Sequence, residues 1–150
     1  MVTKKQIDDF FSANRYGFAG VSGNQKKFTH KVFKELILKD YDIIPVNPKY
    51  EDIDGFICFR TVESLPKDVT SMLIMTPKDQ TMSVINDSLE NDINNIWVQQ
   101  GAENEEIIDF AQKSNANIIT GECIMMYAEP VNSIHRVHRF FSKLTGKYIK

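Results

Sequence analysis

The 150-residue sequence predicts an α/β protein with a Rossmann-like, doubly wound parallel sheet. Two observations lead to this fold class. Short apolar runs, such as residues 16–21 and 71–76, lack the alternation of a strand with one wet face, so we expect strands covered on both faces. Segments with helical spacing separate these runs, and a helix is the usual crossover between parallel strands. A chain of this length is most simply one domain.

The predicted helices carry recognisable start signals. Thr3 and Gln6 form a capping box before a helix over about residues 4–13. Thr29 is a favourable N-cap for a second helix that ends near residue 39. Pro77 fits the first turn of a third helix over about residues 78–90. Glutamates, which favour the positive end of a helix dipole, begin a fourth helix over about residues 104–114.

Six strands are predicted, over residues 16–21, 42–46, 56–59, 71–76, 95–99 and 117–120. Pro45 lacks an N–H, so the end of the second strand is expected to pair on one side only. The link from the second to the third strand, residues 47–55, is short, because a parallel crossover usually takes a dozen or more residues.

Charge separates the last residues from the rest of the chain. Residues 130–150 hold five Lys and Arg and no acid, which leaves 13 basic and 20 acidic residues in 1–129, a balance of −7. The sequence therefore predicts a domain over 1–129 with a basic helical extension over 130–150, and no nucleic-acid partner. Ile134, Val137, Phe141 and Leu144 form a narrow apolar seam in that extension, which docks on the domain or on a second copy.

The composition narrows the class of protein further. No stretch approaches the roughly 18 apolar residues of a membrane span, and the N-terminus lacks an apolar signal core, so a cytoplasmic protein is expected. Cys58 and Cys123 match no metal spacing and are expected to be buried thiols. His135 and His138 lie three residues apart without a third ligand nearby, so no metal site is predicted.

A candidate anion site follows the first strand. Residues 22–28 form a small, polar, basic loop that leads into a helix, and the first N–H groups of a helix point at whatever lies before it. The second strand ends in Asn47, Pro48 and Lys49. Folds that bind NAD carry Asp or Glu at this place, whereas an amide and a cation suit a ribose that carries a phosphate.

The order of these motifs resembles a known family. In their order and spacing, the motifs are similar to the small stand-alone CoA-binding domain proteins, and to the CoA-binding domain of the succinyl-CoA synthetase α-subunit. The motifs are Gly20-Val21-Ser22, Lys27-Phe28, 44–48, Gly55, Ser64-Leu65, Thr76-Pro77, 97–101 and 123–125. The resemblance covers about residues 10–127. It implies the strand order 3-2-1-4-5-6, with a ligand at the switch point between the first and fourth strands.

The resemblance and the residue pattern together predict a site for coenzyme A. Ser22 is expected to donate its hydroxyl and backbone N–H to the pyrophosphate, and Lys49, with Arg60 nearby, to bind the 3′-phosphate. Gly23 stands where many relatives carry a larger residue, so a loose loop is expected. The predicted binding residues are Gly20, Ser22, Gly23, Asn24, Lys26, Lys27, Phe28, Asn47, Pro48, Lys49, Thr76, Pro77, Gln100 and Gly101.

Several roles stay open at this point. Phe28 stacks on adenine or fills the core. Asn24 is expected to hold the loop's turn, and Gln100 and Gly101 to contact the pantetheine arm. Cys123 is more readily a buried apolar residue than a partner of the CoA thiol. His30 could add a hydrogen bond beside the phosphate site.

The leading hypothesis is a small, non-catalytic protein that binds CoA or an acyl-CoA, because no nucleophile with a base and no acid pair is recognisable in the sequence. The alternative is an NAD(P)-binding redox sensor or oxidoreductase subunit, in which Glu51 or Asp52 supplies the carboxylate after the second strand. A subunit that joins a separate synthetase-like partner, or a homodimer formed through the C-terminal helix, is also open.

Overall fold

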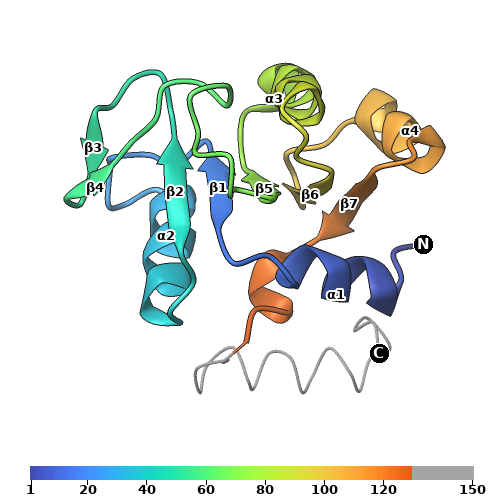
Figure 1. Cartoon of the computed structure of the whole chain (residues 1–150), viewed down its shortest axis with the longest axis horizontal. Helices are drawn as coiled ribbons and strands as arrows, with labels where there is room; N and C mark the ends of the chain where they lie inside the picture. Colours follow the sequence, from blue (N-terminus) through green and yellow to red (C-terminus); the bar gives the residue numbers. More distant parts are fainter. Residues whose placement is uncertain (130–150) are drawn as a thin grey trace.

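A five-stranded parallel sheet in the order β2-β1-β5-β6-β7 forms the centre of the computed structural model, which describes residues 1–129 (Figure 1). Its strands are β1 (Tyr16–Ala19), β2 (Ile43–Val46), β5 (Ser71–Ile74), β6 (Asn95–Gln99) and β7 (Asn117–Glu122). The helices are α1 (Lys4–Phe11), α2 (Phe28–Leu38), α3 (Lys78–Glu90) and α4 (Glu105–Lys113), with a 3-10 turn η1 (Ile124–Met126). The fold class predicted from the sequence is confirmed.

The sheet carries an apolar layer on each face. On one face α1, α2 and η1 bury Phe10, Phe33 and Ile124 against Phe18 and Trp97 of the sheet. On the other face α3 and α4 pack on the alternate side chains of the same strands. The buried side chains of this second layer include Ala19, Val46, Met72, Ile74, Ile85, Ile96 and Ile107. Helices on both faces explain why the strands read as continuous apolar runs.

The helix starts agree with the sequence except at α2. Thr3 and Gln6 form the predicted capping box of α1. Helix α2 begins one residue before Thr29, with Lys27 as the N-cap. The Thr29 hydroxyl instead accepts a hydrogen bond from the backbone N–H of Ser22 at 3.1 Å. The prediction that Thr29 caps the helix is therefore wrong, because its side chain serves the preceding loop.

The predicted third strand differs most from the structure. Residues 52–57 fold into an antiparallel hairpin of β3 (Asp52–Ile53) and β4 (Phe56–Ile57), outside the main sheet. After the hairpin, Phe59 pairs with β2 in an isolated parallel bridge to Val46. The nine-residue link is too short for a helical crossover, and Asp54 and Gly55 both have positive φ, which suits a tight hairpin turn.

The strand order reverses between β1 and β5, which are direct neighbours. The predicted switch point is therefore confirmed, at the carboxyl ends of these two strands. The basic extension over residues 130–150, with its seam and its two histidines, lies outside the described residues. Within residues 1–129, no helix has the length and apolar character needed to cross a bilayer.

Candidate functional site

A groove of about 470 Å³ lies at the switch point, beyond the carboxyl ends of β1, β2 and β5. Ligands of open α/β sheets bind at this place, because no crossover covers it. Six of the predicted binding residues line the groove, from three separate segments of the chain. They are Gly20, Asn47, Pro48, Lys49, Thr76 and Pro77.

Gly20 lets the ends of β1 and β5 approach each other. Its φ is +95°, and a Cβ at this position would lie 2.6 Å from the carbonyl oxygen of Met75. Its backbone N–H donates to the carbonyl of Val46 at 3.2 Å. A side chain at residue 20 would both strain the backbone and separate the strands, so this glycine shapes the floor of the groove.

Asn47 positions the loops around the groove rather than offering its amide to a ligand. Its Nδ2 donates to the carbonyl of Val21 at 2.9 Å, and its Oδ1 accepts from the backbone N–H of Lys49 at 2.9 Å. Its own N–H donates to the carbonyl of Phe59 at 2.9 Å. One side chain therefore fixes the β1–α2 loop and the turn that carries Lys49.

Lys49 and Arg60 form the cationic wall of the groove. Lys49 is exposed, and no ion pair of its ammonium group is found with residues 1–129. Arg60 forms an ion pair with Glu51 at 3.2 Å, but both side chains are largely exposed, so the pair is weak and exchangeable. Both cations are therefore accessible to an anionic group in the groove.

The β1–α2 loop is ordered by its own hydrogen bonds. The hydroxyl of Ser22 accepts from the backbone N–H of Asn24 at 3.1 Å, and Oδ1 of Asn24 accepts from that of Lys26 at 3.0 Å. Asn24 thus holds the turn as predicted. The N–H of Ser22 is bound to Thr29, so its predicted bond to a pyrophosphate is wrong for this conformation. The Ser22 hydroxyl keeps its proton for donation.

Tyr50 occupies the space beside Gly23. A Cβ at residue 23 would lie 2.6 Å from Cε1 of the Tyr50 ring. The missing side chain therefore makes room for an aromatic ring from the loop after β2, and the expectation of a loose loop is wrong. This contact is not visible in the sequence, because the two residues are 27 positions apart.

Phe28 is 57% exposed at the first position of α2. The alternative that it fills the core is therefore wrong, and stacking on a ligand stays a prediction. Lys26 and Lys27, just before it, are also exposed. None of these three side chains lines the groove itself, and neither do Gly23 and Asn24 of the same loop.

Helices α2 and α3 both begin at the switch point without a side-chain cap, whereas Thr3 caps α1 and Asn104 caps α4. Pro77 is the N-cap of α3, and Thr76 Oγ1 lies 2.8 Å from Thr81 Oγ1. Uncapped N–H groups and the positive end of the helix dipole favour an anion. Both helix starts therefore suit a phosphate-bearing ligand.

The far wall of the groove comes from α3 and was missed from the sequence. Gln80, Ser83, Val84 and Asp87 line it, together with Asp79. Their spacing of three and four residues places them on one helix face. That periodicity is visible in the sequence, but only the sheet order shows that this face borders the groove.

Gln100 and Gly101 lie after β6, outside the groove lining. Gly101 has a φ of +95°, and its N–H donates to Glu103 at 2.8 Å. Their contact with a pantetheine arm stays a prediction. Cys58 is buried, and burial raises the pKa of its thiol, whereas Cys123 is half-buried. Within residues 1–129, no three metal-binding side chains come together.

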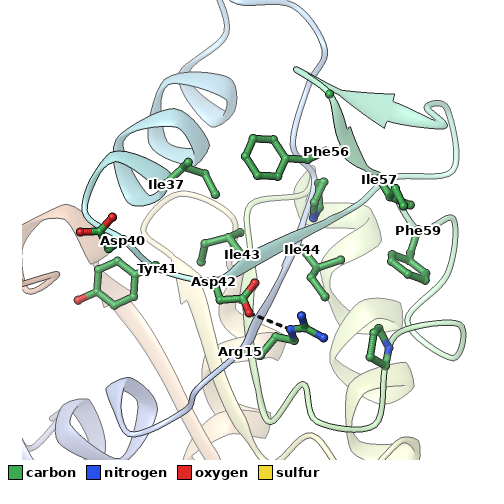
Figure 2. Close-up of a pocket in the computed structure, with 13 residues that line it drawn as sticks. Arg15, Ile37, Asp40, Tyr41, Asp42, Ile43, Ile44, Phe56, Ile57 and Phe59 are labelled. Carbon is green, nitrogen blue, oxygen red and sulfur yellow. Dashed lines mark hydrogen bonds and ion pairs between the residues drawn. The ribbon is translucent and has the colours of Figure 1, made fainter.

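A larger hollow of about 600 Å³ runs along the outer edge of β2 (Figure 2). Its walls are mostly apolar, including Ile44, Phe56 and Phe59, and Arg15 pairs with Asp42 at 3.0 Å on its floor. Arg15 and Asp42 precede β1 and β2, so this ion pair lies at the amino ends of the strands, away from the switch point. None of the predicted binding residues lines it, and we place the candidate site in the smaller groove.

Comparisons with known proteins identify the family of this chain. Residues 14–129 match the family described as CoA binding domain. The uncharacterized protein YneT of Bacillus subtilis is 26% identical over 123 residues, covering 81% of this chain and 91% of that protein. A solved structure of a conserved hypothetical protein from Pyrococcus furiosus is 34% identical, with a TM-score of 0.72, and covers 77% of this chain and 99% of that one.

The same domain also occurs within larger enzymes. The α-subunit of an ADP-forming acetate–CoA ligase of Pyrococcus furiosus is 25% identical over 131 residues, which cover 79% of this chain but only 28% of that subunit. The family match over residues 14–129 includes every strand of the sheet and the residues that line the groove. The chain therefore belongs to the CoA-binding domain family.

Proposed function

We propose that this protein binds coenzyme A or an acyl-CoA in the groove at the switch point. The observation that carries the proposal is the meeting of Gly20, Asn47–Lys49 and Thr76–Pro77 around one groove with two accessible cations. Membership of the CoA-binding domain family supports the same ligand. In this proposal the uncapped starts of α2 and α3 face the pyrophosphate.

Lys49 and Arg60 are proposed to bind the 3′-phosphate of the ligand. Both line the groove on the side of β2, where a dinucleotide-binding fold holds the ribose. A phosphate monoester carries more charge than a ribose hydroxyl, so two exposed cations on this side of the groove favour the phosphorylated ribose. The exposed ring of Phe28 is proposed to stack on the adenine.

The alternative of a nicotinamide cofactor receives less support. It needs a carboxylate after β2, and Glu51 and Asp52 were the candidates. Glu51 is directed to Arg60, and Asp52 accepts from the N–H of Gly55 within the hairpin at 3.1 Å. Neither of them lines the groove, whereas Lys49 does.

We further propose that the protein is a binding module without catalysis of its own. The polar groups that line the groove are hydroxyls, amides and ions, and the Thr81 hydroxyl beside Thr76 donates to the carbonyl of Ala102 rather than to a base. In the ligase subunit of Pyrococcus furiosus the corresponding stretch is about a quarter of the length, so any reaction there has further sequence available. In this proposal, a reaction would require a separate partner chain that supplies the catalytic groups.

Calorimetric titration with CoA, dephospho-CoA and NAD tests the proposal directly. We expect CoA to bind tightest, because only CoA carries the 3′-phosphate. Native mass spectrometry of freshly purified protein would identify a retained acyl group by its mass. Tighter binding of NAD than of CoA would overturn the proposal.

A further inference from the structure

One imidazole ring bridges the β1–α2 loop, which follows Gly20, and the β3–β4 hairpin, which lies between Lys49 and Arg60. His30 is only 2% exposed. Its Nδ1 lies 2.7 Å from the carbonyl oxygen of Ser22, and its Nε2 lies 2.8 Å from Oδ2 of Asp54. Ser22 belongs to the β1–α2 loop, whereas Asp54 belongs to the turn of the β3–β4 hairpin, which lies beside α2 (Figure 1).

Both oxygens that face this ring are acceptors. A carbonyl has no proton to give, and neither has an ionised carboxylate, whereas a neutral imidazole has one N–H and one lone pair. A neutral His30 would therefore set a lone pair against an oxygen at one of the two contacts. An imidazolium donates to both, with the Asp54 carboxylate as its counter-charge.

We propose that His30 is a protonated clamp which fixes the β3–β4 hairpin to the β1–α2 loop and thereby positions Lys49 and Arg60. The inference rests on the proposed binding of coenzyme A, because those two cations are its proposed phosphate contacts. His30 acts through other residues and does not touch the ligand, so it is a positioning residue.

The hairpin needs such an anchor because it is small. Each of its strands has two residues, and a two-stranded hairpin is marginal in water. Besides the His30 pair, Phe56 contacts Phe33 of α2 edge-on at 5.6 Å, and Ile53 is buried. These contacts join the hairpin to the first half of α2.

The hairpin is continuous with the cationic wall. Lys49 lies three residues before β3, and Arg60 lies three residues after β4. Across the base of the hairpin, the N–H of Cys58 donates to the carbonyl of Glu51 at 2.9 Å, and Glu51 pairs with Arg60. A hairpin that leaves the loop would therefore move both cations together.

A single N–H is not enough for both contacts. With one proton on the ring, His30 could donate to the Ser22 carbonyl or to Asp54 but not to both, so loss of the second proton breaks one side of the clamp.

Nitrogen NMR of the imidazole ring in the ligand-free protein tests the clamp without CoA. We expect the His30 ring to carry two N–H protons in the wild type and one in Asp54→Asn, whose side-chain amide can donate to a neutral Nε2. A wild-type ring with a single N–H, or a ring in Asp54→Asn that also carries two, would overturn the proposal.

Calorimetry then measures the effect on the cations. At about pH 6, Asp54→Ala should weaken the binding of CoA about tenfold, which corresponds to roughly one charge-assisted hydrogen bond. The binding of dephospho-CoA should weaken less. Asp54→Asn should keep most of the affinity, because its side-chain amide can still form a hydrogen bond to the ring. Asp68→Asn, which removes an exposed partner of Arg15 away from the groove, is the control. Equal affinities of wild type and Asp54→Ala would overturn the clamp. Absence of CoA binding in the wild type would instead overturn the proposed function and leave the NMR result standing.

Discussion

Individual residues around the groove divide into those that shape it and those that can contact a ligand. Gly20 and Asn47 shape it, since the first permits the approach of β1 to β5 and the second uses its amide within the protein. Lys49 and Phe28 are exposed and offer a cation and an aromatic ring. Substitution of the first group should disturb the fold, whereas substitution of the second should change affinity alone.

Lys49→Ala should weaken CoA far more than dephospho-CoA. A charge-assisted bond to phosphate contributes about 1.5–3 kcal/mol, or roughly 10- to 150-fold in affinity. Calorimetric titration of both ligands measures the difference. Lys67→Ala removes an exposed lysine that does not line the groove and serves as the control. Equal losses for the two ligands would show that Lys49 does not contact the 3′-phosphate.

Phe28→Ala should lower CoA affinity without lowering stability. The ring is 57% exposed, so its removal should change the free energy of unfolding by no more than about 0.5 kcal/mol. Loss of a stacked base costs about 1–3 kcal/mol of binding. Leu38→Ala, at the other end of α2 and 71% exposed, is the matched control. Unchanged affinity would place the adenine elsewhere.

Gly23→Ala should destabilise the protein by about 1–3 kcal/mol, the usual range for overpacking. The new methyl group would lie 2.6 Å from the Tyr50 ring. Chemical denaturation measures the loss, and Tyr50→Ala in the same chain should recover part of it by making room. A single substitution without effect would mean that the ring moves aside at no cost.

At the scale of the elements, side chains from other segments hold several of the loops at the carboxyl edge of the sheet. Thr29 of α2 binds the loop after β1, Asn47 joins that loop to the turn after β2, and Gln99 Oε1 accepts from the N–H of Ile124 at 3.0 Å. Near this last contact, Tyr127 donates to Oε2 of Glu122 at 3.0 Å. Such pairs order the carboxyl edge of the sheet before any ligand arrives.

Glu122 makes stability depend on pH. Burial raises the pKa of its carboxyl above the ordinary 4.5, and the Tyr127 hydroxyl opposes this only in part. The folded protein therefore holds this proton more tightly than the unfolded chain, so this group's contribution to stability falls as the pH rises above about 4.5. Glu122→Gln should raise the melting temperature at neutral pH and leave it nearly unchanged near pH 4. A lower melting temperature at neutral pH would contradict this.

At the scale of the whole molecule, the prediction that concerns assembly falls on residues 130–150, outside the described residues. Their sequence combines an apolar seam with five cations, whereas the domain over 1–129 carries a balance of −7. A short helix is marginal in water by itself, so such a seam is expected to dock. We lean towards docking on a second copy, since two-fold dimers are the commonest oligomers.

Deletion of residues 130–150 should convert a dimer into a monomer. Light scattering of the full chain and the truncated chain measures the mass of each. A full chain that is already monomeric would rule out the dimer and leave docking on the domain itself. A truncated chain that stays equally soluble and stable would contradict both forms of docking.

The sequence by itself determined the class of the fold and named six of the residues that line the groove. Apolar runs without alternation require cover on both faces, and this property is local enough to be read from residues 16–21 or 71–76. Capping signals such as Thr3 with Gln6 are local as well, and the structure has them where they were predicted. The order of the motifs indicated the family.

Only the tertiary structure decided which of those residues meet and which are already engaged. The N–H of Ser22 and the amide of Asn47 are bound within the protein, the Tyr50 ring lies on Gly23, and a face of α3 forms the far wall of the groove. The third predicted strand became a hairpin. Each of these outcomes depends on contacts between segments that are distant in the chain. The free energy of such contacts comes from packing and hydrogen bonding in the folded protein, which a local sequence pattern does not contain.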